Sequence, residues 1–184
     1  MSKKSEFEKL TTNIELALGS NSSKSISVFN TNEKDEELDI ITNIASELEN
    51  LGRKVLLINT IYKKNNFRRN TIFINNIEEV SQVLQEIKNN ERSSRINTIN
   101  LQISRESLRP VLSILLPTLK LIYDRVIIGV ESPNKSADSR VICSLTDTSL
   151  MLLDQNITLR SEVRKIIELL KLANANLIGY VTCK

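Results

Sequence analysis

The chain contains no histidine and no tryptophan. Without histidine it lacks the commonest general base and the commonest metal ligand, which argues against catalytic triads and zinc chemistry. Cys143 falls in an apolar helical stretch and Cys183 at the end of an expected strand, and their spacing matches no metal site. We therefore expect two buried thiols and no metal centre.

Glycine and proline are also scarce, with four and three residues, and they mark no domain linker. The chain has 184 residues, 40% of them hydrophobic and 26% charged, which suits one globular domain with a sizeable core. We expect a single domain over residues 1–184. Within it, an amphipathic helix and a loop (1–22) should precede an α/β core (23–184).

Long apolar runs are absent as well, since no run approaches the length of a membrane-spanning helix. The first ten residues, MSKKSEFEKL, lack the apolar region of a secretory signal. We expect a cytoplasmic domain. Any contact with the inner face of a membrane would then come through a partner or through a transmembrane domain outside this sequence.

The charge balance points to no particular ligand, because a net charge of +3 is too small to argue for nucleic acid. Residues 63–69, KKNNFRR, nevertheless gather four basic side chains: Lys63, Lys64, Arg68 and Arg69. Phe67 is the one aromatic residue among them, too few for a base-stacking platform. A solvated loop is the favoured interpretation, and a surface for anionic lipid or nucleic acid is the alternative.

Apolar periodicity indicates alternating strands and helices. The strand near 54–58 is continuously apolar, which is typical of parallel sheets covered on both faces. The pattern predicts a doubly wound, mostly parallel α/β sheet of five or six strands with helices on both faces. Expected strands lie at 26–29, 54–58, 96–103, 125–130, 148–153 and 177–181, with a less legible apolar piece at 72–74. Expected helices lie at 5–18, 35–51, 77–87, 107–122, 137–145 and 158–172, the second ending at Gly52 and the last capped by Thr158.

The turn between the first strand and the second helix carries carboxylates where a phosphate-binding loop carries lysine. That loop reads G-x-x-x-x-G-K-[ST], whereas this turn has no glycine and its helix opens with Asp35, Glu36 and Glu37. Each contact between a phosphate and a carboxylate at about 4 Å costs roughly 4 kcal/mol at an effective dielectric near 20. The frame of a nucleotide site is present, but it should not bind a nucleotide in the usual way. A simpler explanation, compatible with this one, is that the acidic residues stabilise a helix N-terminus.

Five short motifs, in order, carry a resemblance to a known family. They are FEKLTTNI at 7–14, the strand, turn and helix over 27–45, KVLLIN at 54–59, YDRVII at 123–128 and NLIGYV at 176–181. Together they resemble the bacterial tyrosine kinases of capsule and exopolysaccharide synthesis, within the Walker-type ATPases that include the division and partition ATPases. The resemblance spans nearly the whole chain and implies a P-loop NTPase-like fold.

The departures from the family pattern fall on its chemistry. Lys34, Glu36, Glu37 and Leu38 occupy the phosphate loop, with Glu37 and Leu38 in place of the family's lysine and serine. Asn59 and Ile61 replace the acidic residues after the second strand, and Gly129 replaces the Walker B aspartate. None of the last three offers the carboxylate that Mg²⁺ prefers. The resemblance therefore implies no catalytic residue, no cofactor and no metal.

Two further family features do not carry over. The leading helix of the family uses a glutamate and two arginines in ring assembly, and the matching positions here are Ser5, Glu8 and Thr11. The family's tyrosine-rich tail has no counterpart within these 184 residues. Tyr180 lies in an expected core strand, so we expect it to be a packing residue and not a phosphorylation target.

The leading hypothesis is a pseudo-kinase or pseudo-ATPase that acts as a protein-binding regulator or scaffold. The implied partner is a membrane polysaccharide co-polymerase or an export component, with a homo-oligomer as a further option and no nucleic acid. One alternative is an ATP-dependent tyrosine kinase with an atypical phosphate site built on Lys34 or the basic cluster. Another is a basic-surface module that binds membrane or nucleic acid.

Overall fold

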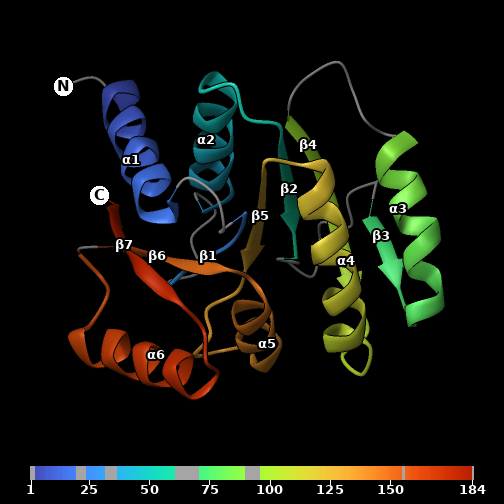
Figure 1. Ribbon diagram of the computed structural model, residues 1–184. Helices are drawn as coiled ribbons and strands as arrows, with labels where there is room; N and C mark the ends of the chain where they lie inside the picture. Colours follow the sequence, from blue (N-terminus) through green and yellow to red (C-terminus); the bar gives the residue numbers. More distant parts are fainter. Residues whose placement is uncertain are drawn as a thin grey trace.

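The computed structural model describes residues 3–19, 24–31, 37–60, 71–89, 96–154 and 156–183. Its centre is one parallel sheet in the order β3-β4-β2-β5-β1-β6-β7 (Figure 1). The strands are β1 (Ser25–Asn30), β2 (Val55–Asn59), β3 (Thr71–Ile74), β4 (Ile96–Ile103), β5 (Arg125–Val130), β6 (Thr148–Asp154) and β7 (Leu177–Cys183). The predicted doubly wound sheet is confirmed. The count of five or six strands is wrong, because the short apolar piece near 72–74 forms the edge strand β3.

Helices cover both faces of the sheet in three layers. They are α1 (Lys3–Leu18), α2 (Glu37–Asn50), α3 (Val80–Asn89), α4 (Leu108–Ile122), α5 (Ala137–Leu145) and α6 (Arg160–Leu172), with a 3-10 turn (Ile77–Glu79) before α3. Apolar residues of α1 and α2 share one core cluster with the sheet, and those of α3 to α6 share the other. The two helices of the first cluster stand next to each other in Figure 1. This division explains why β1, β2 and β5 are buried along their whole length.

The end of α2 agrees with the prediction made from Gly52. This glycine has φ 84°, the left-handed conformation that terminates helices without steric cost. Its N–H donates to the Glu49 carbonyl at 2.7 Å, and the Arg53 N–H donates to the Leu48 carbonyl at 3.1 Å. The chain can therefore reverse at once and enter β2.

The start of α6 differs from the prediction. Leu159, not Thr158, occupies the N-cap position, and its N–H donates to the Glu162 carboxylate at 3.4 Å. The Thr158 hydroxyl lies 2.7 Å from the hydroxyl of Thr31, which follows β1. The capping prediction is wrong because a contact between distant segments engages the hydroxyl that local sequence had assigned to the cap.

The order of the strands places a topological switch between β1 and β5. From β1 the chain crosses to β2 on one side, and from β5 it crosses to β6 on the other, although β1 and β5 are neighbours. In doubly wound sheets, ligands bind outside the carboxyl ends of the strands at such a point. The search for a functional site therefore starts at the carboxyl ends of β1, β2 and β5.

Candidate functional site

Two positions singled out in the sequence lie side by side at this edge. Asn59 ends β2 and Gly129 is the penultimate residue of β5, and the two are direct partners in the parallel ladder. Gly129 is also the partner of Val28 on β1. The structure therefore brings together residues that the resemblance assigned to the metal-binding positions.

The polar groups at the end of β2 are engaged with neighbouring strands. The Thr60 hydroxyl donates to the Gly129 carbonyl at 2.7 Å, and the Thr60 N–H donates to the same oxygen at 3.0 Å. The Asn59 amide donates to the Asn100 side-chain oxygen at 3.3 Å, and Asn59 is buried. These bonds tie β2 to β5 and to β4. Neither Asn59 nor Gly129 carries a carboxylate.

Intact members of the family that the sequence resembles would hold a magnesium-bound nucleotide at this edge. Mg²⁺ prefers carboxylate oxygens in octahedral geometry, and here an amide and a glycine occupy the matching positions. Within the described ranges, no three His, Cys, Asp or Glu side chains lie close enough to hold a metal ion. Among the described residues at this edge, Asn59 and Gly129 do not supply the carboxylates that a magnesium-bound nucleotide would need.

The remaining predicted site residues are placed only in part. The backbone of Glu37 and Leu38 forms the first turn of α2. Outside the described residues lie Lys34, Glu36, Ile61, Lys63, Lys64, Arg68 and Arg69, together with Asp35. The atypical phosphate site and the basic surface therefore stay predictions.

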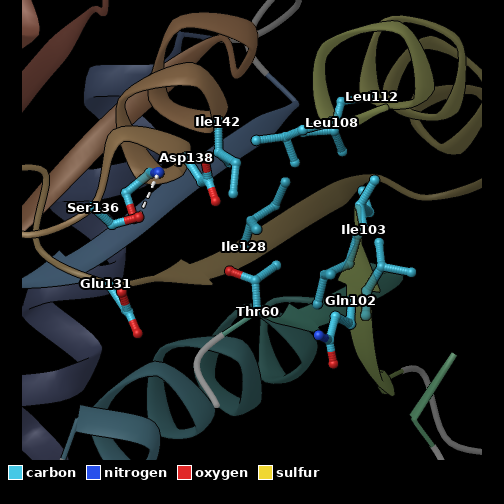
Figure 2. A pocket seen from close by; sticks show the side chains of 13 residues that line it. Thr60, Gln102, Ile103, Leu108, Leu112, Ile128, Glu131, Ser136, Asp138 and Ile142 are labelled. Carbon is cyan, nitrogen blue, oxygen red and sulfur yellow. Dashed lines mark hydrogen bonds between the residues drawn. The ribbon is translucent and has the colours of Figure 1, made fainter. Parts of the chain in front are cut away.

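A pocket that sequence reasoning missed opens beside this edge, between α4 and α5 (Figure 2). Its volume is about 210 Å³. Seven apolar side chains line it: Ile58, Leu101, Ile103, Leu108, Leu112, Ile128 and Ile142. Six polar residues complete the wall: Thr60, Gln102, Glu131, Ser136, Asp138 and Ser139. These residues come from distant segments, and the only sequence signal was a pair of carboxylates shortly after the buried strand β5.

The polar residues of the pocket differ in how they are engaged. The Ser136 hydroxyl accepts from the Ser139 N–H at 3.3 Å and caps α5. Asp138 pairs with Arg105, whose Nε lies 3.1 Å from Asp138 Oδ1. Glu131 is exposed at the rim, with no hydrogen bond or ion pair in the described part of the chain. Glu131 is therefore the carboxylate that remains available to a ligand.

The structure tests one of the two thiol predictions. Cys143 is fully buried in α5, and burial raises the pKa of its thiol, an effect that hydrogen bonds with Ser27 and Ser149 partly oppose. The Ser27 hydroxyl lies 3.4 Å from its sulfur. Cys183 ends β7, but its side chain lies outside the described residues. Cys143 is an inert packing residue at neutral pH.

The prediction that Tyr180 is a packing residue is wrong, and the expectation that it is not a phosphorylation target stays a prediction. Its side chain is 64% exposed. In the part of the chain that the structure describes, Tyr180 lies on the edge strand β7, which pairs with β6 alone. Tyr180 is a surface residue and not a packing residue.

The positions matched to the ring-assembly residues lie on α1. Glu8 is exposed and Thr11 is buried, while the side chain of Ser5 is not described. Thr11 therefore faces the core and does not present its hydroxyl to another subunit.

None of the helices in the described residues has the length and apolar character that crossing a bilayer requires.

Comparison with known proteins finds relatives in structure only. No protein-family model and no curated protein sequence matches the chain. The kinase domain of the Escherichia coli tyrosine kinase ETK matches with a TM-score of 0.77 and 17% identity, covering 98% of this chain and 75% of that domain. The VpsO kinase domain matches with a TM-score of 0.73 and 16% identity, covering 99% and 96%. The MinC:MinD cell division complex of Aquifex aeolicus matches with a TM-score of 0.64 and 16% identity, covering 87% and 67%. The chain has the P-loop NTPase-like fold of the bacterial tyrosine kinase domains and the MinD-type ATPases.

Proposed function

We propose that this domain is a catalytically inactive relative of the bacterial tyrosine kinases and that it acts by binding a protein partner. The observation that carries the proposal is the ladder pair of Asn59 and Gly129 at the carboxyl edge of the sheet. An amide and a hydrogen atom stand there in place of metal-binding carboxylates. The Gly129 carbonyl is itself engaged by the hydroxyl and N–H of Thr60.

The sequence of the first turn supports the same conclusion. Phosphoryl transfer depends almost entirely on positioning the phosphates and neutralising their charge with lysine and a metal ion. Glu37 and Leu38 replace the lysine and the hydroxyl at the start of α2. With the phosphate-binding groups and the metal ligands both lost, an intrinsic kinase or ATPase activity is not expected.

The structural neighbours support a protein as the partner. ETK and VpsO are represented by tyrosine kinase domains, and the MinD neighbour is found in a complex with the protein MinC. We infer a regulatory or scaffolding role in exopolysaccharide or capsule synthesis. The partner would be a membrane polysaccharide co-polymerase or an export component, or else a second copy of this chain, and the domain would act at the cytoplasmic face of the membrane through that partner.

The proposal is tested by calorimetric titration of the purified domain with Mg-ADP and Mg-ATP, beside an intact tyrosine kinase domain. We expect no heat of binding, no ATP hydrolysis above a mock preparation and no autophosphorylation. Binding at micromolar strength would overturn the proposal. If Lys34→Ala then abolished that binding, the atypical phosphate site would be the correct interpretation.

A second titration separates the basic-surface alternative. The domain would be mixed with vesicles containing anionic lipid at low and at moderate salt. Binding through Lys63, Lys64, Arg68 and Arg69 would weaken steeply with salt, because contacts between basic side chains and phosphates release counterions. We expect no such binding.

A further inference from the structure

We propose that the pocket between α4 and α5 is a binding site for a ring-sized apolar group that carries one positive charge. The site lies beside the ladder pair of Asn59 and Gly129 and does not depend on it. It goes beyond the proposed function, because it assigns a ligand chemistry to a pocket whose described lining includes none of the phosphate-loop positions.

The size and lining of the pocket set the apolar part of the ligand. Its volume is about 210 Å³. An apolar cavity of about 150 Å³ binds benzene, so this pocket has room for a six-membered ring with a short substituent. Ile58 and Ile128 contribute from the strands, Leu108 and Leu112 from α4, and Ile142 from α5 (Figure 2). A flat hydrocarbon body entering here would be covered from several sides.

The charges of the lining set the sign of the ligand. Among the described residues that line the pocket, Glu131 and Asp138 are the charged ones. Asp138 is already paired with Arg105, whose Nε lies 3.1 Å from Asp138 Oδ1, so its charge is largely compensated. Glu131 has no such partner among the described residues. A cation at the rim gains from the Glu131 carboxylate, whereas an anion is repelled by it.

The hydrogen-bonding groups favour the same ligand. The Thr60 hydroxyl is already donated to the Gly129 carbonyl, and the Ser136 oxygen already accepts from the Ser139 N–H. The strongest acceptor left in the wall is the Glu131 carboxylate. An amidinium, guanidinium or ammonium group supplies the donors that a carboxylate pairs with most strongly.

The test compares three probes of nearly equal shape by NMR titration of the whole protein. Benzamidine carries a ring and a positive charge, benzamide is its neutral counterpart and benzoate is negative. We expect benzamidine to perturb the signals of the pocket residues, benzamide to bind about tenfold more weakly and benzoate not to bind. Two further probes separate the sources of this chemistry. Tighter binding of tyramine would indicate a free aromatic amine, and tighter binding of a capped Phe-Arg dipeptide, which carries both a ring and a guanidinium group, would indicate a protein partner.

Two variants make the test specific to the charge. Glu131→Gln removes an exposed charge without changing the core. It should weaken the binding of benzamidine about tenfold and leave the affinity for benzamide unchanged. Glu168→Gln, at an exposed position on α6 away from the pocket, should change neither. Equal binding of all three probes would overturn the proposal, as would unchanged affinity in Glu131→Gln or no binding by about 10 mM. These results do not depend on nucleotide binding, so this proposal and the proposed function can fail separately.

Discussion

Glu15 on α1 accepts two hydrogen bonds from Arg125 at the start of β5, from Nε at 2.6 Å and from Nη2 at 2.8 Å. Arg125 is buried, and its Nη1 donates to the Asp124 carbonyl at 2.8 Å. Arg53, before β2, reaches the same carboxylate at 2.9 Å from a more exposed position. One carboxylate on the leading helix therefore joins α1 to the amino ends of two central strands.

Glu15→Ala should destabilise the domain by about 3 kcal/mol, because it leaves the buried Arg125 guanidinium without its partner. The matched variant Arg53→Ala breaks an exposed pair with the same carboxylate and should cost less than about 1 kcal/mol. Urea unfolding of both variants measures the difference. Equal losses would show that the burial of Arg125 does not matter.

Asp147 precedes β6 and joins it by hydrogen bonds to the start of β1, at the same amino edge of the sheet. Its carboxylate accepts from the backbone N–H groups of Lys24 and Ser25 and the Ser25 hydroxyl, and from Lys120 Nζ at 2.8 Å. Burial alone would raise its pKa, but Lys120 and these hydrogen bonds outweigh burial and hold the pKa below its ordinary value. The folded state therefore binds this proton less readily than the unfolded state.

The stability that Asp147 contributes is thus complete above its unfolded pKa of about 4 and is lost as the pH falls through its lower folded pKa. At pH 7, Asp147→Asn should cost about 1–3 kcal/mol. The gap between wild type and variant should shrink in acid, as followed by unfolding at a series of pH values. Asp138→Asn, at a more exposed ion pair, serves as the control and should show little effect. A gap that stayed constant down to strong acid would contradict the assignment.

Tyr123 and Tyr180 form a natural pair of tests. Tyr123 is buried and its hydroxyl accepts from the Asn97 amide at 2.9 Å, so Tyr123→Phe removes that acceptor and should cost about 1 kcal/mol. Tyr180→Phe removes a hydroxyl from a largely exposed side chain and should stay within about 0.5 kcal/mol of wild type. Thermal unfolding of both variants compares them. A larger effect at Tyr180 would mean that this edge is covered in solution.

Cys143 should be unreactive in the folded protein, because its sulfur is buried and burial raises the pKa of the thiol. In a Cys183→Ser background, labelling by a disulfide reagent should be at least about a hundredfold slower than in urea, since it requires opening of the core. In the Cys143→Ser variant, the labelling rate of the remaining thiol, Cys183, serves as the reference. Rapid labelling of native Cys143 would show that α5 opens readily.

Most helices and strands could be predicted from the local pattern of apolar residues. The strands at 96–103 and 125–130 and the helix at 137–145 coincide with β4, β5 and α5, because continuous apolar runs and amphipathic periods decide such segments. The strand β3 did not emerge clearly. It has four residues, and its place beside β4 depends on a ladder with a distant segment.

Only part of the candidate site was predicted from the sequence. Asn59 and Gly129 were identified through the resemblance, and the parallel register places them together. The pocket was not predicted, because Glu131, Asp138 and the apolar residues of α4 belong to segments that local pattern treats separately.

By itself, the sequence determined the layered α/β class and predicted, through the resemblance, the loss of the phosphate- and metal-binding residue types. Both follow from which side chains are present and from their local spacing. Only the tertiary structure decided that Tyr180 is exposed, that Glu15 holds Arg125 and that a pocket opens between α4 and α5. These features depend on strand order and on contacts between segments that are distant in the sequence. The free energy of each such contact is set by its burial and its neighbours, which no local sequence pattern encodes.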